Sequence, residues 1–373
     1  MPRFSVIVPV HNVEAFVREA LESVLDQSYA DFELIVVDDH SPDGCGAIID
    51  TYAALDPRVS AVHLPENVGL GRARNAGLAL ATGEYVIFLD SDDTLTPGTL
   101  RAITERLRAT DSPDVLVFDY ARTHDDGRVV RNQLAGLLRH DGPASFALAD
   151  RPKLINLLPV SWNKAYRRAF IEDTGLTFPP GFYEDAPWTY PVLVSARTLA
   201  VLDRECVHYR QRTGSILSTT SRRHLDLLDQ YDRVFAFLDG DACHERWRPL
   251  LYRRMARHYG HLVADRRRLP REARTEFFRR AADSMSRHHA PGAAPALGVR
   301  LRQLLMRRGA RRTYWALSAA GALRARAATT ARRTGAAPLR TTPRTAAPTL
   351  PVPPCGCPPR APRTHPAARA STS

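Results

Sequence analysis

The first 120 residues of the chain alternate between two patterns of apolar positions. Continuous apolar runs at 4–10, 32–37 and 84–89 are typical of strands that are buried on both faces. Between 13 and 25, apolar residues recur at helical spacing. Further helices are expected over 46–55, 70–81 and 97–109, and short strands over 59–64 and 115–118. This order predicts an α/β fold of right-handed βαβ units, with a mostly parallel sheet flanked by helices.

The pattern changes after about residue 150. Residues 150–215 mix helix, loop and strand, whereas 222–290 have the apolar spacing of helices. Beyond about 325, alanine, arginine, threonine and proline dominate, and such a segment buries too little apolar surface to offset its ordering entropy. The expected domains are an α/β domain over 1–220, a helical extension over 221–320 and a disordered tail over 321–373.

The formal charge of +12 is unevenly distributed along the 373 residues. After Asp283 the chain contains 16 arginines and no acid, so the basic character belongs to the C-terminal part. Residues 1–283 carry 36 basic side chains against 40 acids, a net charge of −4. A mildly acidic body is not typical of a nucleic-acid enzyme, and we expect no nucleic-acid partner.

Three further features concern the location of the protein. Five cysteines in a chain of this length do not indicate a disulfide scaffold, no apolar run approaches about 20 residues, and the N-terminus leads directly into a strand. We therefore expect a cytoplasmic protein. Residues 299–318 could form a basic helix with Leu304, Leu305 and Trp315, which gives the hypothesis of peripheral binding to the anionic inner face of the cell membrane. The alternative is a solvated terminal helix.

Clustered acids follow two of the predicted strands. Asp38-Asp39 end one strand, and Asp90-Ser91-Asp92-Asp93 end another. Ligands of open parallel sheets bind beyond the carboxyl ends of the strands, where several like charges are costly unless a cation compensates them. Carboxylate oxygens without nearby histidine or cysteine favour Mg²⁺ or Mn²⁺, which substrate phosphates can complete. In the alternative interpretation these acids cap helices and form turns.

Several short motifs occur in order along residues 3–220. They are Pro9-Val10-His11-Asn12, Val37-Asp38-Asp39, Asn67-Val68-Gly69 with Arg74-Asn75, Leu89-Asp90-Ser91-Asp92-Asp93, Trp162-Asn163-Lys164 and Tyr183-Glu184-Asp185. Together they resemble family 2 glycosyltransferases, which have the Rossmann-like GT-A fold. Residues 3–315 also resemble the first part of actinobacterial bifunctional proteins that continue into a CDP-glycerol glycerophosphotransferase domain.

The resemblance implies a metal-dependent, inverting glycosyltransferase. Its donor would be a nucleotide-diphosphate sugar, its cofactor Mg²⁺ or Mn²⁺, and its acceptor a hydroxyl of a cell-envelope glycan, a teichoic-acid-like polymer or a lipid-linked molecule. By this resemblance, Pro9 and Asn12 would shape the loop under the nucleotide, Asp38 or Asp39 would accept a hydrogen bond from the base, and Arg74 would lie near the nucleotide. Asp92 would bind the metal together with Asp90, which would also lie on the ribose side. Asp185, beside Glu184, would be the general base.

The chemistry of transfer is consistent with a base that is remote in sequence from the metal. In-line attack requires the base to lie across the sugar from the departing diphosphate, and Asp185 comes from a stretch of chain far from Asp92. The alternative for Glu184-Asp185 is the capping of a helix that contains Pro187 in its first turn. Both roles are compatible, because a base at a helix start is held rigidly.

Two further residues keep two interpretations each. Trp162 either stacks on a sugar ring, as an acceptor or sugar contact, or packs in the core. Lys164 either bridges to an acid or contacts the diphosphate.

Two other classes of protein compete with the transferase. Gly69-Leu70-Gly71 at a helix start suggests a dinucleotide-binding dehydrogenase, but Arg74 occupies the place of the third glycine. A catalytically inactive glycosyltransferase-like interaction module is the second alternative, although all the acids that the chemistry needs are present.

Overall fold

The computed structural model describes residues 1–139, 144–212, 219–265 and 267–290, together with single residues between 304 and 314. The chain divides into two compact units, the first of Met1–Arg212 and the second beginning at Thr213. The first unit therefore ends eight residues before the expected boundary at 220. Most of the expected basic helix over 299–318 and the whole expected tail over 321–373 lie outside the described residues.

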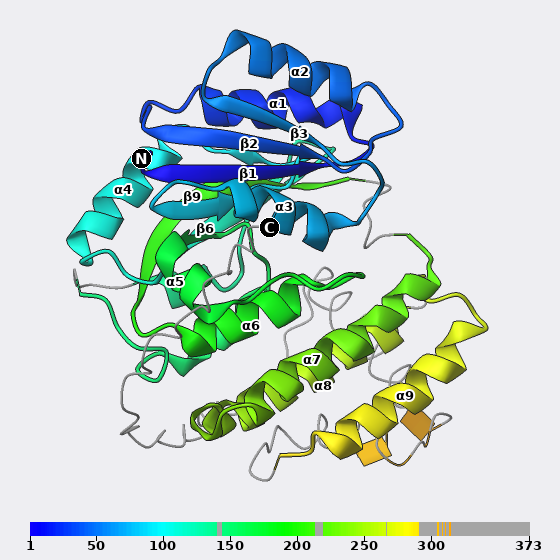
Figure 1. Cartoon of the computed structure of the whole chain (residues 1–373). Coiled ribbons are helices and arrows are strands. Elements are labelled where there is room, and N and C mark those ends of the chain that lie inside the picture. The colour runs from blue at the N-terminus through cyan, green and yellow to red at the C-terminus, as the bar shows by residue number, and fades with distance from the viewer. Residues whose placement is uncertain are drawn as a thin grey trace, which may run out of the picture. The chain divides into compact units, whose positions relative to one another are not determined.

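The first unit is an α/β domain, which confirms the predicted fold class (Figure 1). Its strands are β1 (Phe4–Val10), β2 (Phe32–Asp38), β3 (Val59–His63), β4 (Tyr85–Phe88), β5 (Thr94–Leu95), β6 (Val115–His124), β7 (Val129–Arg131), β8 (Lys164–Arg167) and β9 (Leu199–Gln211). Its α-helices are α1 (Glu14–Leu25), α2 (Cys45–Leu55), α3 (Leu70–Leu80), α4 (Thr99–Ala109), α5 (Arg168–Thr174) and α6 (Asp185–Ser195).

All nine strands found in the described residues belong to one sheet, in the order β3-β2-β1-β4-β8-β6-β9-β5, with β7 paired to β6. The first four strands of this order are mutually parallel, as the βαβ pattern predicted. The other half is mixed, because β8 is antiparallel to both β4 and β6 while β6 and β9 are parallel. The carboxyl ends of β1, β2 and β4 consequently meet at one edge of the sheet.

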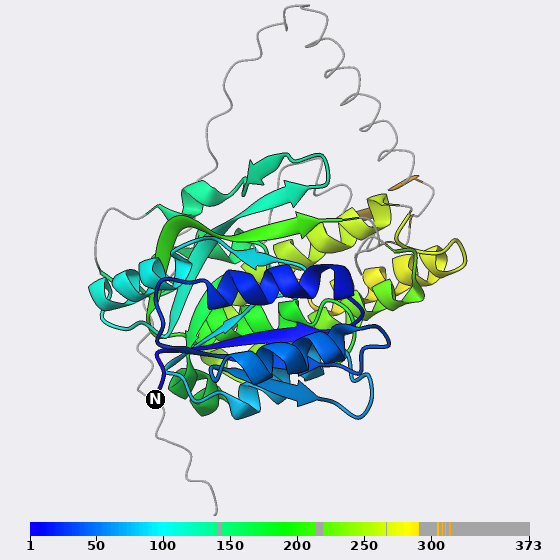
Figure 2. The same ribbon diagram turned by 90° about the horizontal axis from the view of Figure 1, so that it is seen from above.

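Helices cover both faces of the parallel half. Alternate residues of β1 and β2 pack against the apolar stripes of α1 and α2 in one continuous core. These two helices lie side by side over the strands (Figures 1 and 2). On the opposite face α3 packs on β1 and β2. Since every residue of β1 is buried, its continuous apolar run is explained by helices on both sides.

Helix α3 approaches the sheet closely at Gly77. A Cβ atom built on Gly77 would lie 2.5 Å from Ile7 Cγ2 and 3.2 Å from Val37 Cγ2, so the position has no room for a side chain. Gly77 lies one helical turn after Arg74, and both are buried residues of α3. The close contact at Gly77 therefore fixes the height of Arg74 above the sheet edge.

The second unit contains α7 (Asp226–Asp239), α8 (Arg248–Ala264) and α9 (Ala273–Arg287). Each helix buries one apolar face. Tyr231 and Phe235 of α7, Tyr259 of α8 and Phe277 of α9 are at most 1% exposed. No described helix in either unit combines the length and apolar character that a membrane crossing requires.

We expect Gly77→Val to destabilise the first unit by about 2 kcal/mol, because overpacking of a filled contact forces the helix away from the sheet. The matched control is Ala79→Val, which adds a similar side chain at an exposed position of the same helix. Urea unfolding of both variants tests this expectation. Equal midpoints for the two variants would show that α3 can move without loss.

Candidate active site

A single buried arginine gathers three carboxylates at the carboxyl edge of the sheet. Arg74 is fully buried, and its guanidinium pairs with Asp90 (Nη2–Oδ1 2.6 Å), Glu184 (Nη1–Oε1 2.8 Å) and Asp185 (Nη1–Oδ1 3.3 Å). These residues come from three separate parts of the chain, namely α3, the end of β4 and the start of α6. The structure therefore brings together Asp90, the predicted ribose-side acid, and Glu184-Asp185, the two acids that contain the predicted general base.

The cluster carries more negative charge than Arg74 neutralises. Three carboxylates and one guanidinium have a formal sum of −2, and the side chains of Arg74 and Glu184 are 0% and 8% exposed, which limits screening by water. Burial raises the pKa of Glu184 to about 7, and the neighbouring charge of Asp185 acts in the same direction. Burial also raises the pKa of Asp185, against the opposing charge of Arg74. Such surplus charge is typical of sites that take up a cation or a proton.

Local structure holds Asp185 in place. It is the first residue of α6, where a carboxylate is favoured by the helix dipole. Its Oδ1 also accepts a hydrogen bond from the Ser161 backbone N–H (3.2 Å). The helix-capping interpretation and a catalytic role are therefore compatible in the geometry.

The acids that follow Asp90 are held by the end of β9. Arg212 pairs with Asp92 (Nε–Oδ2 2.8 Å), and the Arg210 backbone N–H donates to Asp93 Oδ1 (2.8 Å). Burial and the charge of Asp90 raise the pKa of Asp92, and the same causes raise the pKa of Asp93. These arginines were not among the predicted site residues; Arg210 is the last residue but one of β9, and Arg212 directly follows the strand.

Asp39 performs a structural task at the start of α3. Its Oδ1 accepts from the Val68 N–H (2.7 Å) and its Oδ2 from the Gly69 N–H (2.9 Å). Asp38 Oδ1 accepts from the Ser41 N–H (2.9 Å), and its Oδ2 lies 3.1 Å from His63 Nδ1. Both carboxylates thus have protein partners, and Asp38 is not part of the Arg74 cluster. A hydrogen bond from either acid to a nucleotide base stays a prediction.

The loop after β1 is tied to the loop after β2. Pro9 lies within β1 beside Val37, and Asn12 adopts the left-handed region with φ of 53°. The Asn12 N–H donates to Ser41 Oγ (3.3 Å), and His11 Nδ1 lies 2.9 Å from the Asp39 carbonyl oxygen. Pro9 and Asn12 are therefore at the edge where the resemblance puts the nucleotide, and their role there stays a prediction.

The side chain of Trp162 lies in the core. It is 2% exposed and packs against Tyr120 and Tyr209, with both ring centroids at 4.9 Å. This burial favours the core interpretation over stacking on a sugar ring, because no face of the indole is open to a ligand.

Lys164 does not bridge to an acid in the described residues, and a contact with the diphosphate stays a prediction. Its Nζ donates to the Val160 carbonyl oxygen and to Asn163 Oδ1, each at 2.6 Å, and the side chain is buried. Burial lowers the pKa of Lys164 to about 7, although the charge of Asp185 opposes this shift. These two hydrogen bonds hold the segment that contains Ser161 in place. Lys164 forms no ion pair with a carboxylate in the described part of the chain.

The site offers a divalent cation only part of a coordination shell. Among the described residues, no group of three or more histidine, cysteine, aspartate or glutamate side chains could hold a metal ion. Asp90 and Asp92 each direct one oxygen to an arginine and keep about a fifth of their side-chain surface exposed. Two accessible carboxylates fit Mg²⁺ or Mn²⁺ only if substrate phosphates complete the coordination shell.

Comparison with known proteins identifies the family. A model of glycosyl transferase family 2 matches residues 5–175. The Bacillus subtilis proteins EpsH and EpsJ, both named as glycosyltransferases, are each 30% identical over 253 residues, 66% of this chain and 72% and 73% of their own lengths. The chain belongs to glycosyltransferase family 2. The predicted enzyme class, a glycosyltransferase, is therefore confirmed.

A third relative is known from both sequence and structure. The poly(ribitol-phosphate) beta-N-acetylglucosaminyltransferase TarS of Staphylococcus aureus is 31% identical over 230 residues, which cover 59% of this chain and 37% of TarS. A crystal structure of TarS residues 1–349 in complex with UDP-GlcNAc has a TM-score of 0.67 and 23% identity, covering 89% of this chain and 92% of that chain. The likeness confirms the GT-A fold for this family 2 chain.

We expect Arg74→Met to destabilise the protein by about 3 kcal/mol or more, because three carboxylates then lose their buried partner. Urea unfolding at pH 8 measures the effect. The control is Arg128→Met, which removes an exposed ion pair with Asp126 and should change the free energy of unfolding by less than about 1 kcal/mol. Similar losses in both variants would contradict a central role for Arg74.

Lys164 predicts a pH-dependent stability. Because its folded pKa is about 7 and that of an unfolded lysine is near 10.5, the unfolded chain binds more protons between these values. The free energy of unfolding of the natural protein should therefore rise by about 2 kcal/mol, relative to Lys164→Met, between pH 7 and pH 9. Urea unfolding of both proteins at several pH values tests this. A difference that does not change with pH would mean that the amine keeps its proton when buried.

Proposed function

We propose that the first unit catalyses metal-dependent transfer of a sugar, with inversion, from a nucleotide-diphosphate sugar to an acceptor hydroxyl. The observation that carries this proposal is the convergence of Asp90, Glu184 and Asp185 on Arg74. An arrangement that served stability alone would not need three carboxylates for one guanidinium. The surplus charge at a partly accessible sheet edge supports a site for a cation and a proton.

Asp185 is proposed as the general base. Its carboxylate would accept the proton of the acceptor hydroxyl while the hydroxyl oxygen attacks the anomeric carbon, a role that contributes about 10²–10⁴-fold to the rate. Arg74 and the Ser161 N–H both favour the ionised form of Asp185, which a base requires. Glu184 shares Arg74 with Asp185, and this shared partner holds the two acids in a fixed orientation.

Asp92 and Asp90 are proposed to hold the cation. When bound, Mg²⁺ or Mn²⁺ would stabilise the negative charge that develops on the departing diphosphate. Arg212 already contributes positive charge beside Asp92, and Arg210 and Arg212 hold the acidic segment against β9. The chain thus orients these carboxylates before the donor arrives, which reduces the reorganisation needed in the reaction.

Relatives suggest the substrates. TarS is named as a poly(ribitol-phosphate) beta-N-acetylglucosaminyltransferase, and its structure was solved with UDP-GlcNAc. We therefore propose a nucleotide-sugar donor and a cell-envelope acceptor, of which a teichoic-acid-like polymer is the preferred class over other glycans and lipid-linked acceptors. The resemblance to the actinobacterial bifunctional proteins is consistent with this class. A location in the cytoplasm, at the inner face of the membrane, would give access to both substrates.

The variants Asp92→Asn and Asp185→Asn separate the two proposed functions of the site. Asp185→Asn should keep donor binding and lose transfer by at least about 10²-fold. Asp92→Asn should lose both metal-dependent donor binding and transfer. The measurements are thermal shifts with a panel of nucleotide-diphosphate sugars, with and without Mn²⁺, and release of nucleotide in the presence of acceptor.

Circular dichroism of both variants serves as the control for folding. Normal transfer by Asp185→Asn would place the base elsewhere, and normal metal-dependent binding by Asp92→Asn would remove this residue from the cation site. If no nucleotide sugar stabilises the natural protein with or without Mn²⁺, the inactive interaction module becomes the better description.

A further inference from the structure

The solvent side of α8 carries only positive or titratable nitrogen side chains at its polar positions. Between Pro249 and Ala264 the sequence contains three arginines, two histidines and no acid. The opposite side of the helix is buried through residues such as Leu251, Met255 and Tyr259. We call Arg253, Arg254, Arg257 and His261 the α8 basic face. His258 is not part of it, because its ring packs against Tyr231 of α7 and burial lowers its pKa to about 3.

The groups of the α8 basic face repel one another. Residues 253, 257 and 261 are spaced by four, which puts their Cβ atoms roughly 5–6 Å apart on a helix. Burial lowers the pKa of Arg253, and the charge of Arg257 adds to this. The pKa of His261 is lowered by burial and further by the charges of Arg257 and Arg254. The helix therefore concentrates positive charge at a cost to its own stability.

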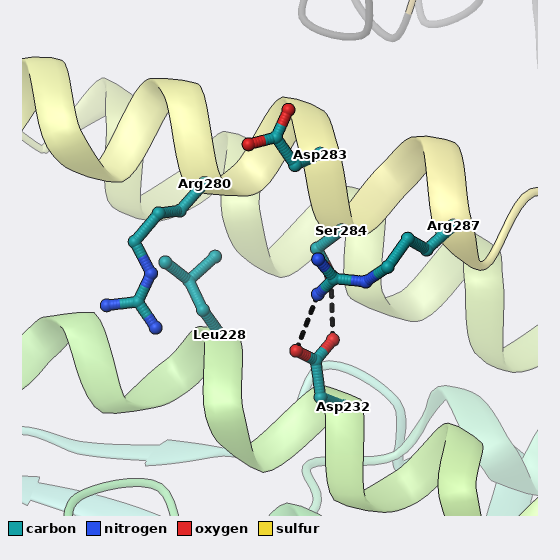
Figure 3. Close-up of a pocket in the computed structure, with 6 residues that line it drawn as sticks. All are labelled: Leu228, Asp232, Arg280, Asp283, Ser284 and Arg287. Atoms are coloured by element: carbon teal, nitrogen blue, oxygen red, sulfur yellow. Dashed lines mark hydrogen bonds and ion pairs between the residues drawn. The ribbon is translucent and has the colours of Figure 1, made fainter.

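Two arginines of α9 differ from these, because each pairs with an acid of α7; Figure 3 shows Arg287 with its partner Asp232. Around a cavity of about 210 Å³ between α7 and α9, Arg287 pairs with Asp232 (2.6 Å) and Arg280 with Asp229 (2.7 Å). In contrast, neither Arg253 nor Arg257 forms an ion pair with a carboxylate of the described chain. The charges of Arg253 and Arg257 are thus left available to an external anion.

The other side chains of α8 indicate which class of anionic partner the helix could bind. Insertion into a membrane requires exposed apolar side chains, and among the described residues none of the large exposed ones lies on α8. Single-stranded nucleic acid is bound by stacking on exposed aromatic rings, yet Tyr252 and Tyr259 are 3% and 0% exposed. A flexible polymer with regularly spaced phosphates and no bases needs neither feature.

We propose that the α8 basic face binds the phosphodiester backbone of an anionic polyol-phosphate polymer, which is the acceptor of the transfer reaction. This inference rests on the proposed function of the first unit and adds a second contact for its acceptor. Several weak ionic contacts along a flexible chain would retain the polymer between successive transfers, because rebinding is then local rather than from solution. Binding of this kind falls steeply with salt.

The test compares two double variants of the full chain. Arg253→Gln/Arg257→Gln removes two charges from the face, and Arg271→Gln/Arg279→Gln removes two exposed charges elsewhere in the second unit. The probe is a fluorescently labelled poly(glycerol phosphate) oligomer, followed by anisotropy over a range of salt concentrations. We expect the first variant to bind about tenfold more weakly, with a salt slope smaller by about one to two, and the second to resemble the natural protein.

Donor binding is measured by thermal shift on the same preparations. A loss of donor binding would count against the proposed function of the first unit, whereas polymer binding by the same preparations would still test the α8 proposal. Equal polymer affinity in both double variants would overturn the α8 proposal. The proposal also fails if anionic phosphatidylglycerol vesicles or an oligouridylate bind more tightly than the polymer and lose more affinity in the first variant.

Discussion

The ion cluster around Arg74 is the interaction on which the rest of the site depends. One guanidinium joins α3, the end of β4 and the start of α6, which are remote in sequence. Its fork geometry suits several carboxylates at once, whereas a lysine in the same place would offer only a point charge. The cluster therefore connects these three elements and leaves a net negative charge at this edge of the sheet.

The position of Arg74 is in turn determined by its helix. Asp39 binds the first N–H groups before α3, and Gly77 lets the helix lie close to β1 and β2. A residue that the sequence suggested for ligand binding thus contributes by holding a helix. An acid at this edge can therefore hold an element in place and still be a candidate for the proposed chemistry, as Asp185 is at the start of α6.

The parallel half of the sheet could be predicted because buried strands and amphipathic helices alternate there at regular spacing. β5, β7 and β8 have two to four residues each, too short for a periodic signal. Asp38, Asp39, Asp90 and Asp92 were found from their positions after apolar strands, whereas Glu184 and Asp185 were named from the family resemblance. The pairing of three of these acids with Arg74 and the hydrogen bonds of Lys164 were not predicted, because the partners of a buried charge are recognisable only from the side chains that surround it in space.

The path of the chain out of the first unit gives one further consequence. Arg212, the last described residue of that unit, pairs with Asp92, so the chain leaves the unit directly after a residue that contacts the acidic segment. A chimaera that exchanges helical units between family members should therefore be joined after this arginine. A junction placed within β9 would separate the acidic loop from the strand that secures it, even if both units folded correctly.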